Sequence, residues 1–196
     1  MARFVKSVLC LLVVLSIVSC ATTSSIETNK NVAYSEPIKK LFVVINTGDW
    51  KYIVYETPEK PNSAYHEVLL SDYLAKKVEE KVKVSGVEVK ADKVEKLELG
   101  LDRINKERDD FGATWVMSIT LTWVGINGYG YPLKCTYDVS ILDEQNAPNP
   151  TYPVVWRATV ATGYMRGLDP DKTVDNILSG LIKDGLISTH APLKSS

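Results

Sequence analysis

The chain has 196 residues, which is enough for one domain with a sizeable hydrophobic core. Its 23 basic and 24 acidic residues give a formal net charge of −1. The sequence shows no cluster of basic residues of the kind that binds nucleic acids. Length and charge therefore favour a single folded domain and argue against a nucleic-acid-binding protein.

Residues 1–20 have the layout of a secretory signal peptide. Arg3 and Lys6 give a positive start, and a continuous apolar run follows over residues 8–15. This run is too short for a membrane-spanning helix, which needs about 20 apolar residues. We therefore expect residues 1–19 to be a signal peptide.

The end of this segment resembles the bacterial lipobox, in which an aliphatic residue and two small or medium-sized residues precede an invariant cysteine. Here these residues are Ile17, Val18, Ser19 and Cys20. In that family the cysteine receives a diacylglyceryl group, the chain is cut just before it, and the new amine is acylated. The resemblance implies a lipoprotein with fatty acyl chains such as palmitate on Cys20. The alternatives are an ordinary cleaved signal peptide and an uncleaved anchor.

The residue after the cysteine bears on the destination. In lipoproteins of two-membrane bacteria, Asp at this position tends to retain the protein at the inner membrane, and this chain has Ala21. The family rule implies an outer-membrane protein whose domain faces the periplasm. The membrane is then a partner through the N-terminal lipid, because more than one acyl chain gives stable attachment.

Cleavage before Cys20 leaves a mature chain of 177 residues. It has 21 basic and 24 acidic residues, a formal net charge of −3. Because Cys10 is removed and Cys20 is lipidated, Cys135 remains alone and forms no internal disulfide. Cys135 lies in an alternating apolar row, so we expect a small buried hydrophobic residue rather than a reactive thiol.

Three parts of the mature chain can be distinguished. Residues 20–38 are mostly small and polar and predict a lipidated N-terminus and flexible tether. We expect a single α+β domain over residues 39–187 and a disordered tail over residues 188–196. The apolar run of residues 41–45 predicts a strand buried on both faces. Residues 50–62 fit either a hairpin with that strand or an aromatic loop.

Two helices are predicted next. Apolar spacing indicates one helix that is capped by Ser63 and runs to about residue 84. A second is expected to be capped by Asp92 and to end at Gly112. Residues 87–89 predict a short strand between them. We assign the charged residues of the second helix to a solvated face.

Three strands follow in which apolar and polar residues alternate. They cover residues 115–123, 133–141 and 156–164. Alternation with a period of two predicts an antiparallel sheet with one buried and one solvated face. A final helix is capped by Asp169 and ends at Gly185.

The element order β-α-β-α-β-β-β-α predicts an α+β two-layer sandwich. Its mixed sheet contains an antiparallel three-stranded meander, and the helices pack on one face. This order resembles small domains of several envelope lipoproteins, including those of curli secretion and the amino-terminal domain of the TolB protein. Those relatives imply scaffold or assembly roles without catalytic residues.

One charged pair is of interest on the solvated sheet face. Asp138 and Arg157 lie directly across from each other in the expected register of their strands. They are either an exposed cross-strand ion pair, which contributes about 0.2–1 kcal/mol, or part of a polar binding face. In the second interpretation Thr120, Thr136 and Thr159 complete that face.

The sequence offers no catalytic constellation. His66 and His190 have no cysteine or aspartate at metal-ligand spacing, and no serine lies in a nucleophile-elbow context. Residues 125–130 are glycine-rich, but they join two antiparallel strands and therefore predict a hairpin tip rather than a phosphate loop. We expect no enzyme activity, no metal and no cofactor.

Aromatic residues in or beside turns are the candidate interaction residues. They are Trp50, Tyr52, Tyr55, Tyr129 and Tyr131. Aromatic side chains often dominate the binding energy of interfaces. The alternative is that these rings cover the ends of the sheet.

These observations predict a non-enzymatic, membrane-anchored lipoprotein that acts as a binding or assembly module in the bacterial cell envelope, with another envelope protein as its partner. The alternative is a periplasmic carrier of small molecules or lipids, with an apolar cavity between the helices and the sheet. A large cavity there would favour the carrier. A tight core with exposed aromatic residues would favour the binding module.

The anchor can be tested by replacing its cysteine. Because the thiol of Cys20 is the acceptor of the lipid, Cys20→Ala should abolish labelling by radioactive palmitate and leave the precursor uncut by the lipoprotein peptidase. Cys10→Ala, within the signal, should be labelled and processed normally. Normal labelling of the Cys20→Ala protein would refute the lipoprotein assignment.

Overall fold

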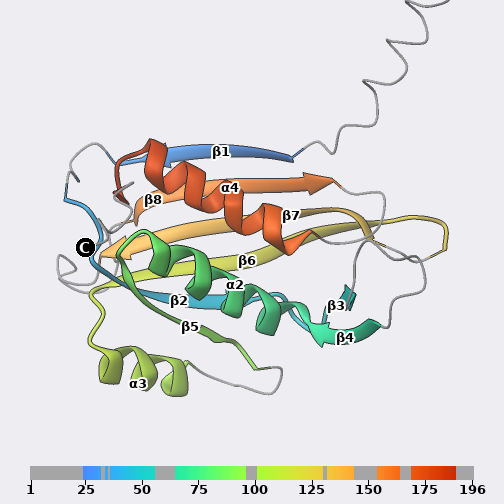
Figure 1. Ribbon diagram of the computed structural model, residues 1–196, viewed down its shortest axis with the longest axis horizontal. Coiled ribbons are helices and arrows are strands. Elements are labelled where there is room, and N and C mark those ends of the chain that lie inside the picture. The colour runs from blue at the N-terminus through green and yellow to red at the C-terminus, as the bar shows by residue number, and fades with distance from the viewer. Residues whose placement is uncertain are drawn as a thin grey trace, which may run out of the picture.

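The computed structural model describes residues 24–31, 34, 36–55, 65–95, 101–129, 132–143, 154–163 and 169–188. Six strands form one mixed sheet in the order β1-β8-β7-β6-β2-β5, and β3 pairs with β4 in a small second sheet (Figure 1). The strands are β1 (Ser24–Lys30), β2 (Lys40–Asn46), β3 (Lys51–Tyr55), β4 (Tyr65–Leu69), β5 (Glu88–Lys93), β6 (Trp115–Ile126), β7 (Pro132–Asp143) and β8 (Val154–Gly163). The helices are α2 (Leu70–Val84), α3 (Asp102–Phe111) and α4 (Pro170–Lys183).

The expected α+β class is confirmed. Strands β6, β7 and β8 form the antiparallel meander, and β2 runs parallel to both β5 and β6. Helices α2 and α4 pack together across one face of the six-stranded sheet (Figure 1). None of the described helices is long and apolar enough to cross a membrane.

Strand β2 contributes to two hydrophobic clusters because successive side chains of a strand point to opposite faces. Leu41, Val43 and Ile45 belong to the main core under α2 and α4. Phe42 belongs to a separate small cluster with Ile104 of α3. Helix α3 therefore packs at the β5 edge of the sheet, apart from the main helical layer.

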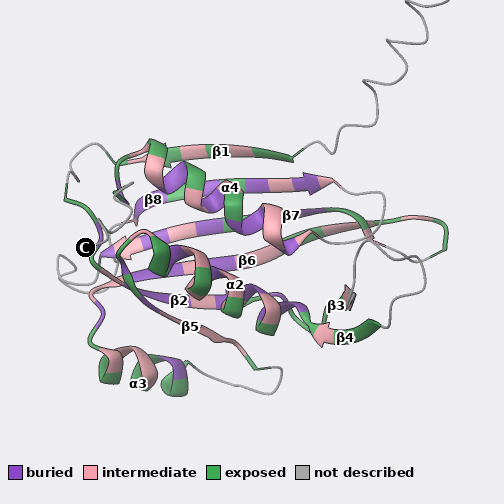
Figure 2. Cartoon of the chain, in the orientation of Figure 1, coloured by how far each residue is buried: buried purple, intermediate pink, exposed green. Residues whose placement is uncertain are grey.

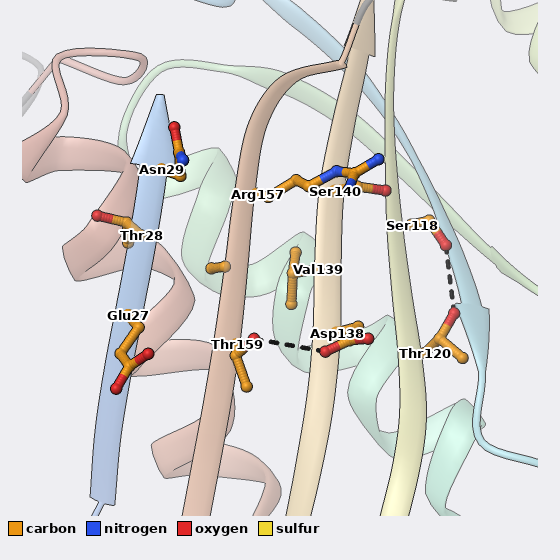
Figure 3. A pocket seen from close by; sticks show the side chains of 11 residues that line it. Glu27, Thr28, Asn29, Ser118, Thr120, Asp138, Val139, Ser140, Arg157 and Thr159 are labelled. Atoms are coloured by element: carbon orange, nitrogen blue, oxygen red, sulfur yellow. Dashed lines mark hydrogen bonds between the residues drawn. The ribbon is translucent and has the colours of Figure 1, made fainter. Parts of the chain in front are cut away.

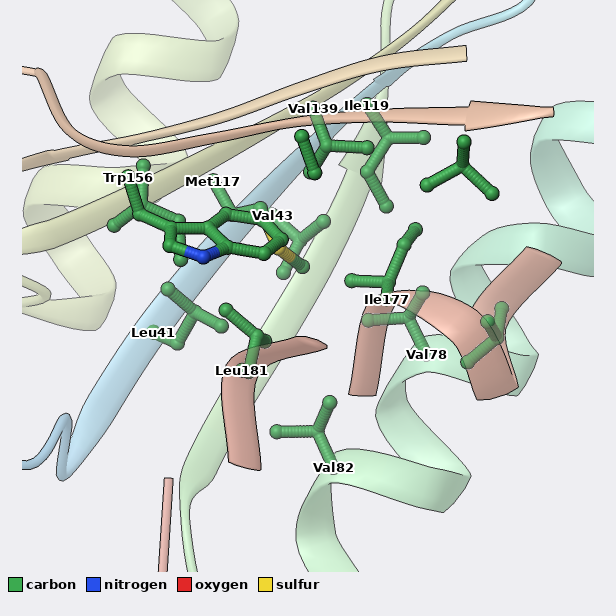
Figure 4. Packing of buried hydrophobic residues seen from close by; sticks show 14 of the residues in the cluster. Leu41, Val43, Val78, Val82, Met117, Ile119, Val139, Trp156, Ile177 and Leu181 are labelled. Atoms are coloured by element: carbon green, nitrogen blue, oxygen red, sulfur yellow. The ribbon is translucent and has the colours of Figure 1, made fainter. Parts of the chain in front are cut away.

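The main core is centred on Trp156 of β8, whose side chain is completely buried (Figure 4). Its indole Nε1 donates a hydrogen bond to Oδ2 of Asp184 at 2.7 Å, just after α4. A Cβ atom on Gly180 of α4 would lie 3.1 Å from Cζ2 of Trp156 and 2.8 Å from Cδ1 of Ile26. Glycine at this position therefore lets α4 approach β8 and β1 closely.

The predicted tether is wrong for residues that the structure places in the domain. Residues 24–30 form β1, which pairs antiparallel with β8 along its whole length. Tyr34 packs edge-to-face on Trp115, with ring centroids 6.0 Å apart. Ile38 is buried, and its N–H donates to the carbonyl of Leu186 at 2.8 Å. The signal peptide, Cys20 and residues 189–196 of the expected tail lie outside the described residues.

The predicted starts of the first two helices need correction. Residues 65–69 form β4, so the first helix begins at Leu70, and Ser63 lies outside the described residues. Residues 51–55 pair with β4, so of the two alternatives for residues 50–62 the hairpin with β2 does not form. Asp92 belongs to β5 and caps no helix, since α3 begins at Asp102.

All three predicted helix ends and the predicted start of the last helix are confirmed, and the first helix ends at Val84 as expected. Gly112 follows α3 with φ of 69°, the left-handed conformation that glycine adopts readily. Oδ1 of Asp169 accepts a hydrogen bond from the N–H of Lys172 at 3.0 Å, as expected for the cap of α4. Gly185 has φ of 71° just after the end of α4.

The alternation of β6 and β7 is confirmed near the middle of the sheet and fails towards their shared hairpin. A register shift between Leu121 and Trp123 reverses the faces, so that Val124 packs on the core while 52% of Trp123 is exposed. Leu133 is also exposed rather than buried. Figure 2 shows how burial gives way to exposure along this end of both strands.

Trp156 provides a test of the core. Truncation to alanine should lower the free energy of unfolding by about 3–5 kcal/mol, because it leaves a cavity under α4, and it also removes the hydrogen bond to Asp184. Chemical denaturation followed by circular dichroism measures this loss. The matched control is Trp123→Ala, which should cost far less because half of that side chain is already exposed. Equal losses in the two variants would contradict the assigned sheet faces.

Candidate functional site

The sheet face opposite α2 and α4 carries a polar hollow of about 600 Å³ (Figure 3). Strands β1, β8, β7 and β6 form its floor. Its polar side chains come from alternate positions of these strands, and the lining residues include Glu27, Asn29, Ser118, Thr120, Asp138, Ser140, Arg157 and Thr159. A rigid, hydrogen-bonded sheet thus presents hydroxyl, carboxylate and guanidinium groups on one solvent-open surface.

The strand register orders these side chains into two rows across the sheet. Glu27, Thr159, Asp138 and Thr120 are successive cross-strand neighbours in the first row. The second row consists of Asn29, Arg157, Ser140 and Ser118. Within the rows, Thr159 Oγ1 donates to Oδ1 of Asp138 at 3.5 Å. The hydroxyl oxygens of Ser118 and Thr120 lie 3.4 Å apart.

The predicted pairing of Asp138 with Arg157 is wrong by two residues. Asp138 lies opposite Thr159, and Arg157 lies opposite Ser140. A shift of two keeps both side chains on the predicted face, because the side-chain period of a strand is two. Arg157 extends across the sheet toward Ser140 (Figure 3) and makes no ion pair or hydrogen bond within the described residues.

The polar groups of the hollow are suited to binding a ligand that carries a carboxylate or phosphate. Two carboxylates, Glu27 and Asp138, flank the single guanidinium of Arg157, and the remaining polar groups are hydroxyls and an amide. An arginine side chain offers a planar set of donors that matches a carboxylate or phosphate in two parallel hydrogen bonds. No histidine or cysteine lines the hollow, and no group of metal-ligating side chains is found among the described residues.

Sequence reasoning found part of this site and missed its outer strand. Asp138, Arg157, Thr120 and Thr159 were expected on the polar face, whereas Thr136 does not line the hollow. The residues of β1 were missed because their segment was assigned to the tether. The signal in that segment is weak, since Ile26 is its one large apolar residue and packs only partly against the core.

A second hollow, of about 490 Å³, lies where β2 and β5 end and α2 begins. Its lining includes Asn46, Asp49, Ser71 and Lys93. Nζ of Lys93 forms an ion pair with Oδ1 of Asp72 at 2.6 Å. The charge of Lys93 is therefore balanced by a neighbouring carboxylate, whereas no ion pair of Arg157 is found in the part of the chain that the structure describes.

The candidate aromatic residues do not form one cluster. Tyr129 is 88% exposed at the tip of the β6–β7 hairpin, and Trp50 is exposed just before β3. Tyr52 packs partly against the core, and its ring lies 4.7 Å from that of Tyr73. Tyr131 and the side chain of Tyr55 lie outside the described residues.

Cys135 is a buried hydrophobic residue, as predicted. Only 1% of it is exposed, and its Sγ lies 2.9 Å from Oγ1 of Thr162. Burial raises the pKa of the Cys135 thiol, so little reactive thiolate forms at neutral pH. The side chain therefore takes part in packing, and it does not face the polar hollow.

No family model matches the chain, and a search of curated proteins finds no match. Among solved structures, the PelC dodecamer from Paraburkholderia phytofirmans shares 16% sequence identity, with a TM-score of 0.48 over 86% of this chain and 100% of that chain. A DUF4136 family protein from Bacteroides thetaiotaomicron shares 13%, with a TM-score of 0.44 over 83% and 96%. A lipoprotein from Neisseria meningitidis shares 14%, with a TM-score of 0.35 over 74% and 96%. We transfer no function from likenesses at this level.

Proposed function

We propose that this protein is a non-enzymatic lipoprotein of the bacterial cell envelope that binds another envelope protein through the open face of its sheet. The observation that carries this proposal is the guanidinium of Arg157, which lies within two rows of polar side chains and makes no ion pair or hydrogen bond with any other described residue. The lipobox-like residues before Cys20 support the membrane anchor, and Ala21 supports the outer membrane as its location.

The open face has the properties of a preorganised docking surface. Four strands fix the spacing of its side chains, so a partner need not pay for ordering a loop when it binds. A carboxylate of the partner can take two hydrogen bonds from Arg157. Donor groups of the partner can bind Glu27 of β1 and Asp138 of β7, the two strands that flank Arg157 of β8.

The carrier hypothesis receives no comparable support. The space between the helices and the sheet is filled by apolar side chains such as Val78, Val82, Ile177 and Leu181, each at most 2% exposed (Figure 4). The described hollow lies instead on the opposite sheet face, and its lining is rich in polar groups. These features favour recognition of a polar surface over transport of an apolar molecule.

Photo-crosslinking in living cells tests the docking face. A photoreactive amino acid at Ser140, beside Arg157, should give a crosslinked adduct with a partner protein. The matched control position is Lys76, which is exposed on α2 on the other side of the molecule. It should give no such adduct.

The same experiment tests the role of Arg157. Arg157→Ala should reduce the adduct at Ser140 about tenfold or more, the effect of losing a bond of 1.4 kcal/mol or more to a charged group. Arg157→Lys should restore it only in part, since lysine lacks the planar set of donors. Because Arg157 is exposed, its removal should change stability by no more than about 0.5 kcal/mol. If the photoreactive residue at Lys76 gives an adduct with the partner, and Arg157→Ala does not reduce that adduct, the proposal is contradicted.

A further inference from the structure

Exposed apolar side chains gather at one end of the molecule. Ten large hydrophobic residues are exposed among the described residues, and eight of them belong to, or directly flank, the hairpins β3–β4 and β6–β7. They are Trp50, Ile53, Tyr65, Leu69, Trp123, Ile126, Tyr129 and Leu133. Strands β2 and β6 run parallel and both end here, so the two hairpins lie at the same end of the sheet (Figure 1). We call this the apolar end.

The N-terminus of β1 lies at the same end. Ser24 is aligned across the sheet with Thr162, Cys135 and Val124, which stands close to the β6–β7 hairpin tip. Cys20 precedes Ser24 by only four residues. A chain of four residues spans at most about 14 Å when fully extended. A lipid on Cys20 would therefore hold the apolar end within about that distance of the membrane.

The β6–β7 hairpin is apolar on both of its faces. Strand β2, which pairs with β6, ends opposite Thr120, so β6 continues past the end of β2 for six residues. Leu133 alternates with Lys134 and therefore shares the face of the helices, whereas Trp123 lies on the opposite face beside Thr136. Tyr129 forms the tip, where its N–H donates to Oδ1 of Asn127 at 2.9 Å. A docked protein would cover one face of this hairpin, whereas a lipid layer surrounds both.

We propose that the β6–β7 hairpin tip inserts into the headgroup region of the same bilayer that holds the acyl chains of Cys20. Tyrosine and tryptophan side chains favour the membrane–water interface, because their rings are apolar and their N–H or O–H groups reach water. Lys134 stands beside the tip and matches anionic headgroups. This inference rests on the lipid anchor of the proposed function and assigns Tyr129 to the membrane rather than to a protein partner.

Insertion of the hairpin tip would also determine the distance between the polar hollow and the membrane surface. Pro132 begins β7 at the tip, and Asp138 lies six residues further along the strand. At about 3.3 Å per residue the hollow stands about 20 Å from the tip. The docking face would thus be held clear of the membrane surface, where an envelope partner can reach it.

A fluorescent label reports where the tip lies. Tyr129→Cys in the full lipoprotein can be labelled with an environment-sensitive dye, because the thiol of Cys20 is occupied by lipid and Cys135 is buried. Val84→Cys is the matched control. Val84 is 68% exposed and is the last residue of α2, whose first residue lies next to the apolar end. Both proteins are reconstituted into vesicles of phosphatidylethanolamine and phosphatidylglycerol that contain a doxyl-labelled quencher lipid.

We expect the label at Tyr129→Cys to shift to shorter emission wavelengths and to be quenched at least several-fold more than the label at Val84→Cys. Adding Ile126→Asp should abolish most of this difference. If the protein floats with the vesicles but both labels keep the emission of a dye in water and are not quenched, the inference is overturned and the lipid anchor stands. Failure of the protein to carry lipid and float with the vesicles would overturn both. A blue-shifted label at Tyr129→Cys in the unlipidated Cys20→Ser protein without vesicles would show a second copy at the tip and overturn the inference.

Discussion

The pairing of β1 with β8 is the interaction on which the arrangement of this molecule depends. It joins the first described residues after the lipobox-like segment to β8, the neighbouring strand of the six-stranded sheet. Asp184, just after α4, reinforces the junction from two sides. Its carboxylate accepts a hydrogen bond from Trp156 of β8, and its carbonyl accepts one from Nζ of Lys30 at 2.7 Å. The first strand, its neighbour and the last helix are thus held at one point.

This junction has a mechanical consequence for a lipid-anchored protein. A long tether would let the domain adopt any orientation, because a flexible chain fixes only the distance between its ends. Here the sheet begins four residues after Cys20, so a lipid on Cys20 would constrain which end of the sheet meets the membrane. The exposed apolar hairpins lie at that end, and the polar hollow lies further along the same strands. The proposed anchor, the apolar end and the proposed docking face would therefore follow one another along the strands of the sheet.

The sequence predicted those elements whose pattern is both long and regular. Alternation over β7 and β8 placed Tyr137, Val139 and Trp156 in the core, and the cap at Asp169 placed the last helix. The register between β7 and β8 was predicted incorrectly, because it depends on the conformation of the connecting residues 144–153, which alternation does not determine. Asp138 therefore lies opposite Thr159 rather than Arg157.

The missed elements have weak or ambiguous patterns. Strand β1 is an edge strand, so backbone hydrogen bonds to β8 and one apolar side chain, Ile26, are enough to hold it. Its polar composition is also that of a tether. Strand β4 precedes α2 directly, and the apolar residues Val68 and Leu69 fit the spacing of a helix as well as a strand. The reversal of faces at Trp123 follows from a register shift, and no residue type in this part of the sequence predicts that shift.

Amide hydrogen exchange of the mature domain tests the β1–β8 pairing most directly. An edge strand donates alternate N–H groups to its single neighbour, so alternate amides of residues 24–30 should exchange at least 100-fold more slowly than in an unstructured peptide, an opening free energy of about 2.7 kcal/mol. The amides of β8 serve as the internal reference for protected positions. Exchange at the unstructured rate throughout residues 24–30, with β8 still protected, would contradict the pairing and return this segment to a flexible tether.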